Sequence, residues 1–322
     1  MHLSLTEAIR EHIILFDGGM GTEIQKLNPQ PPDFPGKNDG FNDGLTITKP
    51  TWIKKIHRDY LVAGADCIET NSFGSNLFKL KEYGYGDKTV EINQKAAELA
   101  REVCNEFDDR YRYVIGSVGP TGYLPSSEDQ DLGKVSPQQI IDAFIPQFEG
   151  LLLGGVDSLL IETSQDILEV KLAIEACQRA MDALGRYVPL IGNVTLDRYG
   201  NMLLGTNVQA AYTTVCDMGI DIFGLNCSTG PEEMFPSVRW LDEQHGLPIL
   251  VVPNAGMPQN IGGKAVYKMT PGDMASKMHE FVRQFKRIRI IGGCCGTTPQ
   301  HISKLREMLK EEGFTPPNTL SI

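Results

Sequence analysis

The feature that most constrains the fold of this sequence is an eightfold alternation between short apolar runs and longer amphipathic stretches. The apolar runs occupy residues 13–16, 67–69, 113–118, 158–161, 190–194, 222–225, 249–252 and 288–291. Nearly continuous apolar runs of this length are typical of parallel strands that are buried on both faces. Strand–helix alternation repeated eight times predicts an α/β fold, a single (β/α)8 TIM barrel, with residues 1–322 as one domain.

The stretches between the runs have the periodicity of amphipathic helices, and several open with Ser, Thr or Asp followed by Pro or an acidic residue. We expect helices at residues 50–63, 93–106, 137–153, 166–184, 208–218, 231–243, 271–285 and 298–312. Residues 27–49 depart from this rhythm and hold four prolines, which predicts a long loop after the first strand. A doubly wound nucleotide-binding sheet is the alternative fold, but residues 17–21 lack the G-x-G-x-x-G spacing that it requires.

Charge and hydropathy exclude several kinds of partner. The formal net charge is −11 and no cluster of Lys and Arg interrupts it, so neither nucleic acid nor an anionic membrane surface is an expected partner. No apolar stretch approaches the roughly 20 residues that cross a bilayer. The short run at residues 13–16 is too brief for the core of a signal peptide. We therefore expect a cytoplasmic protein.

Polar residues and cysteines follow several of the predicted strands. Asp17 and Gly18 come after the first strand, and Glu162 comes after the fourth. The later strands are followed by Cys227, by Asn254, and by the adjacent pair Cys294 and Cys295. Because the carboxyl ends of barrel strands surround one cleft, we expect these residues to converge there.

Three cysteines at one cleft predict a metal site. Neighbouring residues of a regular strand point to opposite faces, but Gly292, Gly293 and Gly296 allow the backbone to turn both thiols of the vicinal pair toward one point. Three thiolates are typical of a Zn²⁺ site whose fourth position is free for substrate. The alternative is that all three are buried core thiols, as we expect for Cys67, Cys104, Cys177 and Cys216. We assign no role to the six histidines.

A zinc site of this kind suits a thiol substrate, because the metal stabilises the thiolate and leaves its sulfur nucleophilic. Asp17 and Glu162 are expected to accept hydrogen bonds from a substrate ammonium group, and the N–H groups of Gly18 and Gly19 to meet a carboxylate. The alternatives are that Glu162 caps the helix that begins near Asp166 and that Asp17 only holds the following turn.

The sequence resembles the homocysteine S-methyltransferase family, and within it the homocysteine-binding module of cobalamin-dependent methionine synthase. The resemblance runs from about Ile13 to Leu309, and its motifs are Asp17-Gly18-Gly19-Met20-Gly21-Thr22, Glu69-Thr70-Asn71-Ser72-Phe73, Gly224-Leu225-Asn226-Cys227, Pro253-Asn254-Ala255-Gly256 and Gly292-Gly293-Cys294-Cys295-Gly296-Thr297-Thr298-Pro299.

The resemblance implies a zinc-dependent transferase of methionine biosynthesis that methylates the thiol of L-homocysteine, with Cys227, Cys294 and Cys295 as ligands. It implies that Asp17, Gly18 and Glu162 hold the amino-acid part of homocysteine, and that Asn254 occupies the fourth zinc position until substrate arrives. The chain ends at Ile322, so we expect the donor, methylcobalamin or a related corrinoid, to be carried by a separate protein. The alternatives are S-methylmethionine, betaine or S-adenosylmethionine as donor, or a non-catalytic zinc- and thiol-binding module of a corrinoid assembly.

Overall fold

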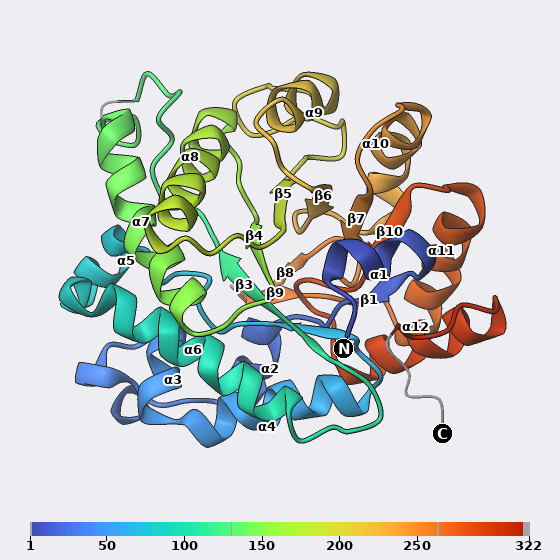
Figure 1. Cartoon of the computed structure of the whole chain (residues 1–322), viewed down its shortest axis with the longest axis horizontal. Helices are drawn as coiled ribbons and strands as arrows, with labels where there is room; N and C mark the ends of the chain where they lie inside the picture. Colours follow the sequence, from blue (N-terminus) through green and yellow to red (C-terminus); the bar gives the residue numbers. More distant parts are fainter. Residues whose placement is uncertain (1, 130, 263, 318–322) are drawn as a thin grey trace.

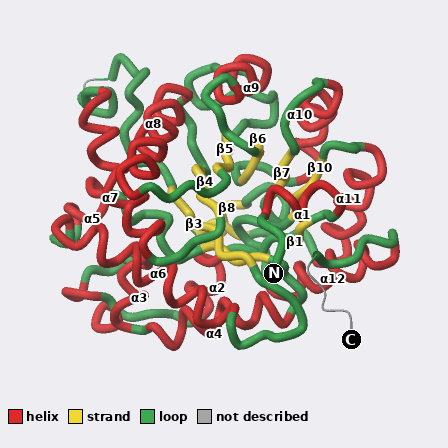
Figure 2. Tube along the Cα trace, in the orientation of Figure 1, coloured by secondary structure: helices red, strands yellow, loops and turns green. Residues whose placement is uncertain are grey.

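The computed structural model describes residues 2–129, 131–262 and 264–317. Its main sheet has eight parallel strands surrounded by helices (Figures 1 and 2). The strands are β1 (Ile14–Leu15), β2 (Cys67–Glu69), β3 (Tyr113–Val118), β4 (Ser158–Ile161), β5 (Leu190–Val194), β6 (Ile222–Asn226), β7 (Ile249–Val252) and β10 (Ile288–Ile291). Their order in the sheet is β1-β10-β7-β6-β5-β4-β3-β2, so from β2 to β10 each strand pairs with the next main strand of the chain, and β1 pairs with β10. The predicted (β/α)8 barrel is confirmed.

Each strand is followed by an outer helix that packs an apolar face on the sheet. These helices are α4 (Pro50–Val62), α6 (Thr89–Cys104), α7 (Pro137–Leu153), α8 (Ile167–Leu184), α9 (Val208–Cys216), α10 (Pro231–Glu243), α11 (Pro271–Gln284) and α12 (Pro299–Glu311). Five of them, α4, α7, α10, α11 and α12, have proline in the first turn, where its missing N–H costs no helical hydrogen bond.

The structure also has short elements that the periodicity does not reveal. They are α1 (Leu5–Glu11), α2 (Met20–Lys26), α3 (Leu45–Thr48), α5 (Leu77–Glu82), the 3₁₀ turns at Pro31–Asp33, Pro35–Lys37, Asn42–Gly44 and Gly86–Lys88, and the hairpin of β8 (Gln259–Ile261) and β9 (Lys264–Val266). The long loop predicted at residues 27–49 thus contains three 3₁₀ turns and the short helix α3. Pro31 and Pro35 each open a 3₁₀ turn, because their fixed φ suits the first position of a helix.

Aspartates at the N-terminal ends of β2, β4 and β6 connect these strands to their neighbours. Each belongs to a Gly-x-Asp turn that follows an outer helix: Gly64-Ala65-Asp66, Gly155-Val156-Asp157 and Gly219-Ile220-Asp221. The carboxylates accept the N–H groups of Leu15, Val114 and Leu190, and the aspartate N–H groups donate to the carbonyls of the same residues, all at 2.7–2.9 Å. The glycines have φ between 79° and 108°, a region that L side chains rarely adopt.

Two aspartates close the barrel between β1 and β2, which form the open edges of the hydrogen-bonded sheet. At the N-terminal end of this seam, Asp66 makes its reciprocal pair with Leu15. At the C-terminal end, the Oδ2 atom of Asp17 accepts the N–H of Glu69 at 3.0 Å. The barrel is thus completed by one backbone hydrogen bond and by two aspartate side chains.

The core has two layers. Side chains of alternate strand positions fill the barrel interior, and α1 closes one end with Leu5, Ala8 and Ile9. A larger cluster lies between the strands and the outer helices. Among the residues that the structure describes, no helix is long and apolar enough to span a bilayer.

Candidate metal and substrate site

The C-terminal ends of β6 and β10 bring three cysteine sulfurs together. Cys227 follows β6, and Cys294 and Cys295 follow β10. The Sγ atoms of the three residues all lie within 4.8 Å of one another, and those of Cys227 and Cys295 are 3.8 Å apart. Three sulfurs at this spacing can all face one ion at the ordinary zinc–sulfur distance of about 2.3 Å. The predicted convergence of these cysteines is what the structure shows.

Backbone conformations at the two strand ends aim the thiols. Cys227 and Ser228 both have a φ of 59°, which is rare for residues other than glycine. Such conformations cost free energy and cluster at functional sites. After β10, Gly296 turns the chain with a φ of 79°. A turn at each strand end therefore points sulfurs from separate strands into one space.

The roles of the glycines before the cysteine pair differ from the prediction. The prediction held that Gly292 and Gly293 free the backbone, but only Gly296 of the three has positive φ. Gly292 and Gly293 are required by close packing instead. A Cβ at Gly292 would lie 2.4 Å from the Cβ of Phe16, and one at Gly293 would lie 2.5 Å from the Cγ2 of Thr297. The sequence could not show how closely Phe16, after β1, and Thr297, later in the same loop, approach these two glycines.

The thiols of the cluster differ in the direction of their pKa shifts. Hydrogen bonds from Cys227 first, then from Cys294 and Tyr267, lower the pKa of Cys295. Hydrogen bonding to Cys227 and then to Cys295, followed by burial, raises the pKa of Cys294. The pKa values of the two adjacent cysteines are thus shifted in opposite directions.

Asp17 lies at the end of β1 and is only 2% exposed. Burial above all, with the nearby charge of Glu162 adding to it, raises the pKa of Asp17 well above its usual range. The alternative that Asp17 only holds the following turn does not describe its contact, because its carboxylate reaches across the seam to the N–H of Glu69. Its role toward a substrate stays a prediction.

Glu162 lies at the end of β4 within a set of neutral donors. Its Oε1 accepts the Ser117 hydroxyl at 2.5 Å, and its Oε2 accepts the Asn226 amide at 3.1 Å. Burial raises the pKa of Glu162 to about 7 despite these hydrogen bonds. The alternative that Glu162 caps α8 is wrong, since the N-cap is Asp166, whose side chain accepts the Leu168 N–H at 2.9 Å.

Glu69, at the end of β2, is a third carboxylate in this group, which the sequence analysis did not assign. Burial first, and then the charges of Glu162, Asp17 and Cys295, raise the pKa of Glu69 well above its usual range. Its position as the last residue of a predicted strand was the available signal. The three carboxylates thus come from three different strands and repel one another at the C-terminal end of the barrel.

Gly18 permits close packing at the end of β1. A Cβ there would lie 2.7 Å from the Oγ1 of Thr297 and 2.8 Å from the Tyr60 ring. The N–H of Gly19 donates to the same Thr297 hydroxyl at 3.1 Å, so it is already used within the protein. The expectation that a substrate carboxylate meets these backbone donors stays a prediction for Gly18 alone.

Asn254, after β7, is 1% exposed, and its Oδ1 accepts the N–H of Cys295 at 3.1 Å. This bond fixes the second cysteine of the pair relative to β7. An amide oxygen has two lone pairs, so the contact leaves one for a metal. The structure therefore places Asn254 beside the thiols, and its role as a fourth ligand stays a prediction.

The cysteines predicted to be core residues divide into two kinds. Cys67, Cys104 and Cys177 are buried, whereas Cys216 on α9 is half-buried at the edge of the outer layer. The histidines, given no role from the sequence, include a structural one. His301 in α12 accepts the Thr298 N–H at its Nδ1, so its Nε2 carries the proton and donates to the Met269 carbonyl at 3.1 Å.

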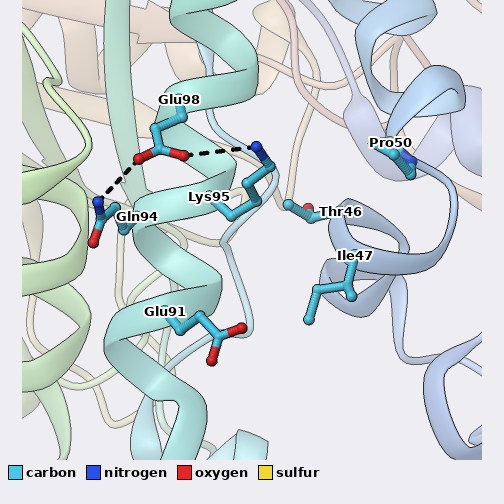
Figure 3. Close-up of a pocket in the computed structure, with 7 residues that line it drawn as sticks. All are labelled: Thr46, Ile47, Pro50, Glu91, Gln94, Lys95 and Glu98. Carbon is cyan, nitrogen blue, oxygen red and sulfur yellow. Dashed lines mark hydrogen bonds and ion pairs between the residues drawn. The ribbon is translucent and has the colours of Figure 1, made fainter.

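A cavity of about 390 Å³ lies elsewhere, on the outer helical layer between α3 and α6 (Figure 3). Three of its polar lining residues contact one another, since Glu98 accepts Gln94 at 2.9 Å and lies 3.6 Å from Lys95. The chemistry-bearing residues described above do not line it, so the cavity plays no part in the candidate site.

A barrel with a triple-cysteine cluster and buried carboxylates at its strand ends defines a class of enzyme that acts on thiols. The chain matches the homocysteine S-methyltransferase family over residues 14–309 and belongs to that family. The prediction of a methyltransferase of this type is confirmed at the level of the family.

Two relatives share substantial sequence with the chain. It is 40% identical over 304 residues to methionine synthase of Mycobacterium tuberculosis, covering 94% of this chain and 25% of that protein. The identity to methionine synthase of Mycobacterium leprae is also 40%, covering 94% of this chain and 24% of that protein. The chain thus spans about a quarter of the length of the curated relatives it matches.

A solved structure shows the same fold. The homocysteine methyltransferase MmuM from Escherichia coli, in its metallated form, superposes with a TM-score of 0.72 at 23% identity. The match covers 92% of this chain and 96% of that one.

Proposed function

We propose that this chain methylates the thiol of L-homocysteine to give methionine, with Zn²⁺ held by Cys227, Cys294 and Cys295. The observation that carries the proposal is the convergence of three thiols from two strand ends within 4.8 Å. All three donors are soft sulfur atoms, which select zinc over the harder divalent ions. When bound, the ion would favour the thiolate form of an incoming thiol.

The carboxylates supply the rest of the site. Asp17, Glu69 and Glu162 repel one another in a buried cleft, so an ammonium group placed among them would stabilise their charged forms. We assign that group to the amino end of homocysteine and its carboxylate to the N–H of Gly18. In this arrangement Asn254 holds the fourth zinc position until the substrate sulfur replaces it.

The methyl donor is a methylcorrinoid on a separate protein or module. The likeness to the homocysteine-binding module of cobalamin-dependent methionine synthase supports this choice, as does the 40% identity to methionine synthases of which the chain spans about a quarter. Residues 1–322 then act as a single homocysteine-binding barrel domain.

Methyl transfer from four donors tests the proposal: methylcobalamin, S-methylmethionine, betaine and S-adenosylmethionine. We expect methionine formation from methylcobalamin in the zinc-loaded wild type and none in Cys294→Ser. Turnover with one of the other three donors alone would retain the thiol chemistry and reject the corrinoid. Bound zinc without turnover from any donor would favour the non-catalytic module.

A further inference from the structure

Asn226 is the last residue of β6 and directly precedes Cys227, yet its side chain bonds to the end of β4. In the sheet, β5 lies between these two strands. The Asn226 Oδ1 accepts the Thr163 N–H at 2.9 Å. Its Nδ2 donates to the Glu162 Oε2 at 3.1 Å and to the Thr163 hydroxyl at 2.9 Å. Asn226, which is 2% exposed, therefore uses both amide N–H groups and its oxygen at the end of β4.

The orientation of this amide follows from its partners. A backbone N–H can only donate, so the Asn226 atom that faces the Thr163 N–H must be the oxygen. The amide nitrogen is thereby directed at Glu162, whose Oε2 also accepts the Thr163 hydroxyl at 3.3 Å. The Thr163 hydroxyl thus accepts from Asn226 and donates to Glu162. Three side chains form a closed set of hydrogen bonds on one side of the carboxylate.

The backbone is unusual on both sides of this contact. Thr163 has a φ of 56°, and a β-branched residue is an outlier in that region. Cys227, next to Asn226, has a φ of 59°. Such conformations persist where the surrounding structure fixes them, and Asn226 provides two of the bonds that fix Thr163.

A further contact joins the same strand ends. Thr195, after β5, donates its hydroxyl to the Asn226 carbonyl at 3.0 Å and its N–H to the Ser164 carbonyl at 3.0 Å. The ends of β4, β5 and β6 are therefore bonded to one another. Within this frame the Asn226 side chain links Glu162 to the strand end that carries Cys227.

We propose that Asn226 is a positioning residue, which holds the Glu162 carboxylate toward the ammonium group of the substrate and fixes its place relative to Cys227. The inference rests on the proposed function, in which Glu162 binds the amino end of homocysteine and Cys227 lies in the zinc site. Asn226 acts on the substrate through Glu162. Its loss should therefore weaken the recognition of the ammonium group and leave the recognition of the thiol nearly unchanged.

Two thiols separate these effects: L-homocysteine and 4-mercaptobutanoate, which has the same chain without the ammonium group. Each is titrated into the full chain after cobalt replaces zinc, and the change in thiolate-to-cobalt absorption gives its dissociation constant. We expect wild type to bind homocysteine about 100-fold more tightly than 4-mercaptobutanoate. In Asn226→Ala this preference should fall about tenfold, while the dissociation constant of 4-mercaptobutanoate stays within about threefold of wild type.

Asn207→Ala is the matched control, because Asn207 is the exposed N-cap of α9 and its side chain accepts the Ala210 N–H at 2.9 Å. It removes a hydrogen-bonded asparagine side chain outside the site, and the preference should not change. Asn226→Ser is the second variant, since its hydroxyl keeps a polar atom in the buried position but is one bond too short to replace the amide. It should lower the preference as Asn226→Ala does. In a Glu162→Gln background, Asn226→Ala should lower the preference no further.

A wild-type preference in both Asn226 variants would overturn the inference and leave the proposed function intact. An equal loss of affinity for both thiols would also overturn it, since Asn226 would then support the metal site and not Glu162. A wild type that binds both thiols equally, or neither, would overturn the proposed binding of homocysteine and the inference with it.

Discussion

At the N-terminal end of the strands Asp66 faces two arginines, whereas at the C-terminal end Asp17, Glu69 and Glu162 face one another. Asp66 accepts Arg110 at 3.2 Å and also pairs with Arg306, and all three side chains are at most 11% exposed. The N-terminal carboxylates thus have their charge neutralised or bonded to backbone N–H groups. The C-terminal carboxylates have hydroxyl, amide and backbone partners, none of which carries a compensating charge.

The same contrast distinguishes the carboxylates that we expect to stabilise the fold from those that we expect to bind ligand. A buried carboxylate paired with guanidinium groups stabilises the fold, because removing it leaves the guanidinium charges unpaired. Buried carboxylates that repel one another weaken the empty protein and become favourable when a cation arrives. We therefore expect the acids at the N-terminal end to stabilise the fold and those at the C-terminal end, where (β/α)8 enzymes place their active sites, to bind ligand.

The largest effect is expected at the N-terminal end, for Asp66→Asn. Asparagine still accepts the Leu15 N–H, but Arg110 and Arg306 lose their buried counter-charge. We expect the free energy of unfolding to fall by about 3–5 kcal/mol. Denaturant unfolding measures this. A loss below about 1 kcal/mol would show that the pairing of Asp66 with the two arginines does not stabilise the fold.

Glu162→Gln should produce the opposite pattern. Removing a carboxylate whose pKa is raised by burial should leave the free energy of unfolding within about 1 kcal/mol of wild type. Loss of the charged partner of the ammonium group should raise the KM for homocysteine by about 10- to 100-fold. Denaturant unfolding measures the first quantity and steady-state kinetics the second. A loss of stability with an unchanged KM would show that Glu162 stabilises the fold and does not bind the substrate.

Ligand affinity should depend on pH through the same residue. Because burial raises the pKa of Glu162 to about 7, its contribution to the stability of the empty protein is present at acidic pH and is lost as the pH rises through 7. An ammonium ligand favours the ionised carboxylate, so methionine, which has no titrating thiol, should bind up to about tenfold more tightly at a pH near 8 than near 6. Calorimetry measures this, and the dependence should be absent in Glu162→Gln.

The smallest effect is expected for Asp221→Asn. Asp221 makes the same reciprocal pair with the backbone as Asp66, and asparagine retains an acceptor for the Leu190 N–H. We expect a loss of about 1 kcal/mol in unfolding free energy, with zinc content and KM unchanged. A loss as large as that of Asp66→Asn would show that the backbone bond, and not the arginine pairing, stabilises this end.

The sequence predicts the barrel well because each strand is marked by its own apolar run and each main helix by its own periodicity. It also predicts which cysteines meet, since strand ends of a barrel converge. The elements it misses are held by contacts distant in sequence. The short turns between residues 27 and 49 are an example, where Asn42 and Asp43 bond to Asn71 and Gly74 after β2.

Within the candidate site, the missed features are those that depend on three-dimensional approach. The packing of Tyr267 on the Gly296 turn could not be predicted because the β8–β9 hairpin, which precedes Tyr267, carries no strong apolar alternation. Glu69 could not be singled out from the sequence, because its raised pKa depends on burial beside Asp17 and Glu162. The repeated Gly-x-Asp turn was visible as a pattern, but its reciprocal bonds depend on strand register.

The most direct test of the central claim is the zinc content of the reduced protein in wild type, Cys294→Ser and Cys216→Ser. Cys216 is half-buried on α9 and away from the cluster, so it controls for loss of a thiol as such. We expect one zinc per chain in wild type and in Cys216→Ser, and loss of zinc in Cys294→Ser. Wild-type protein without zinc, or Cys294→Ser with wild-type zinc content, would contradict the account.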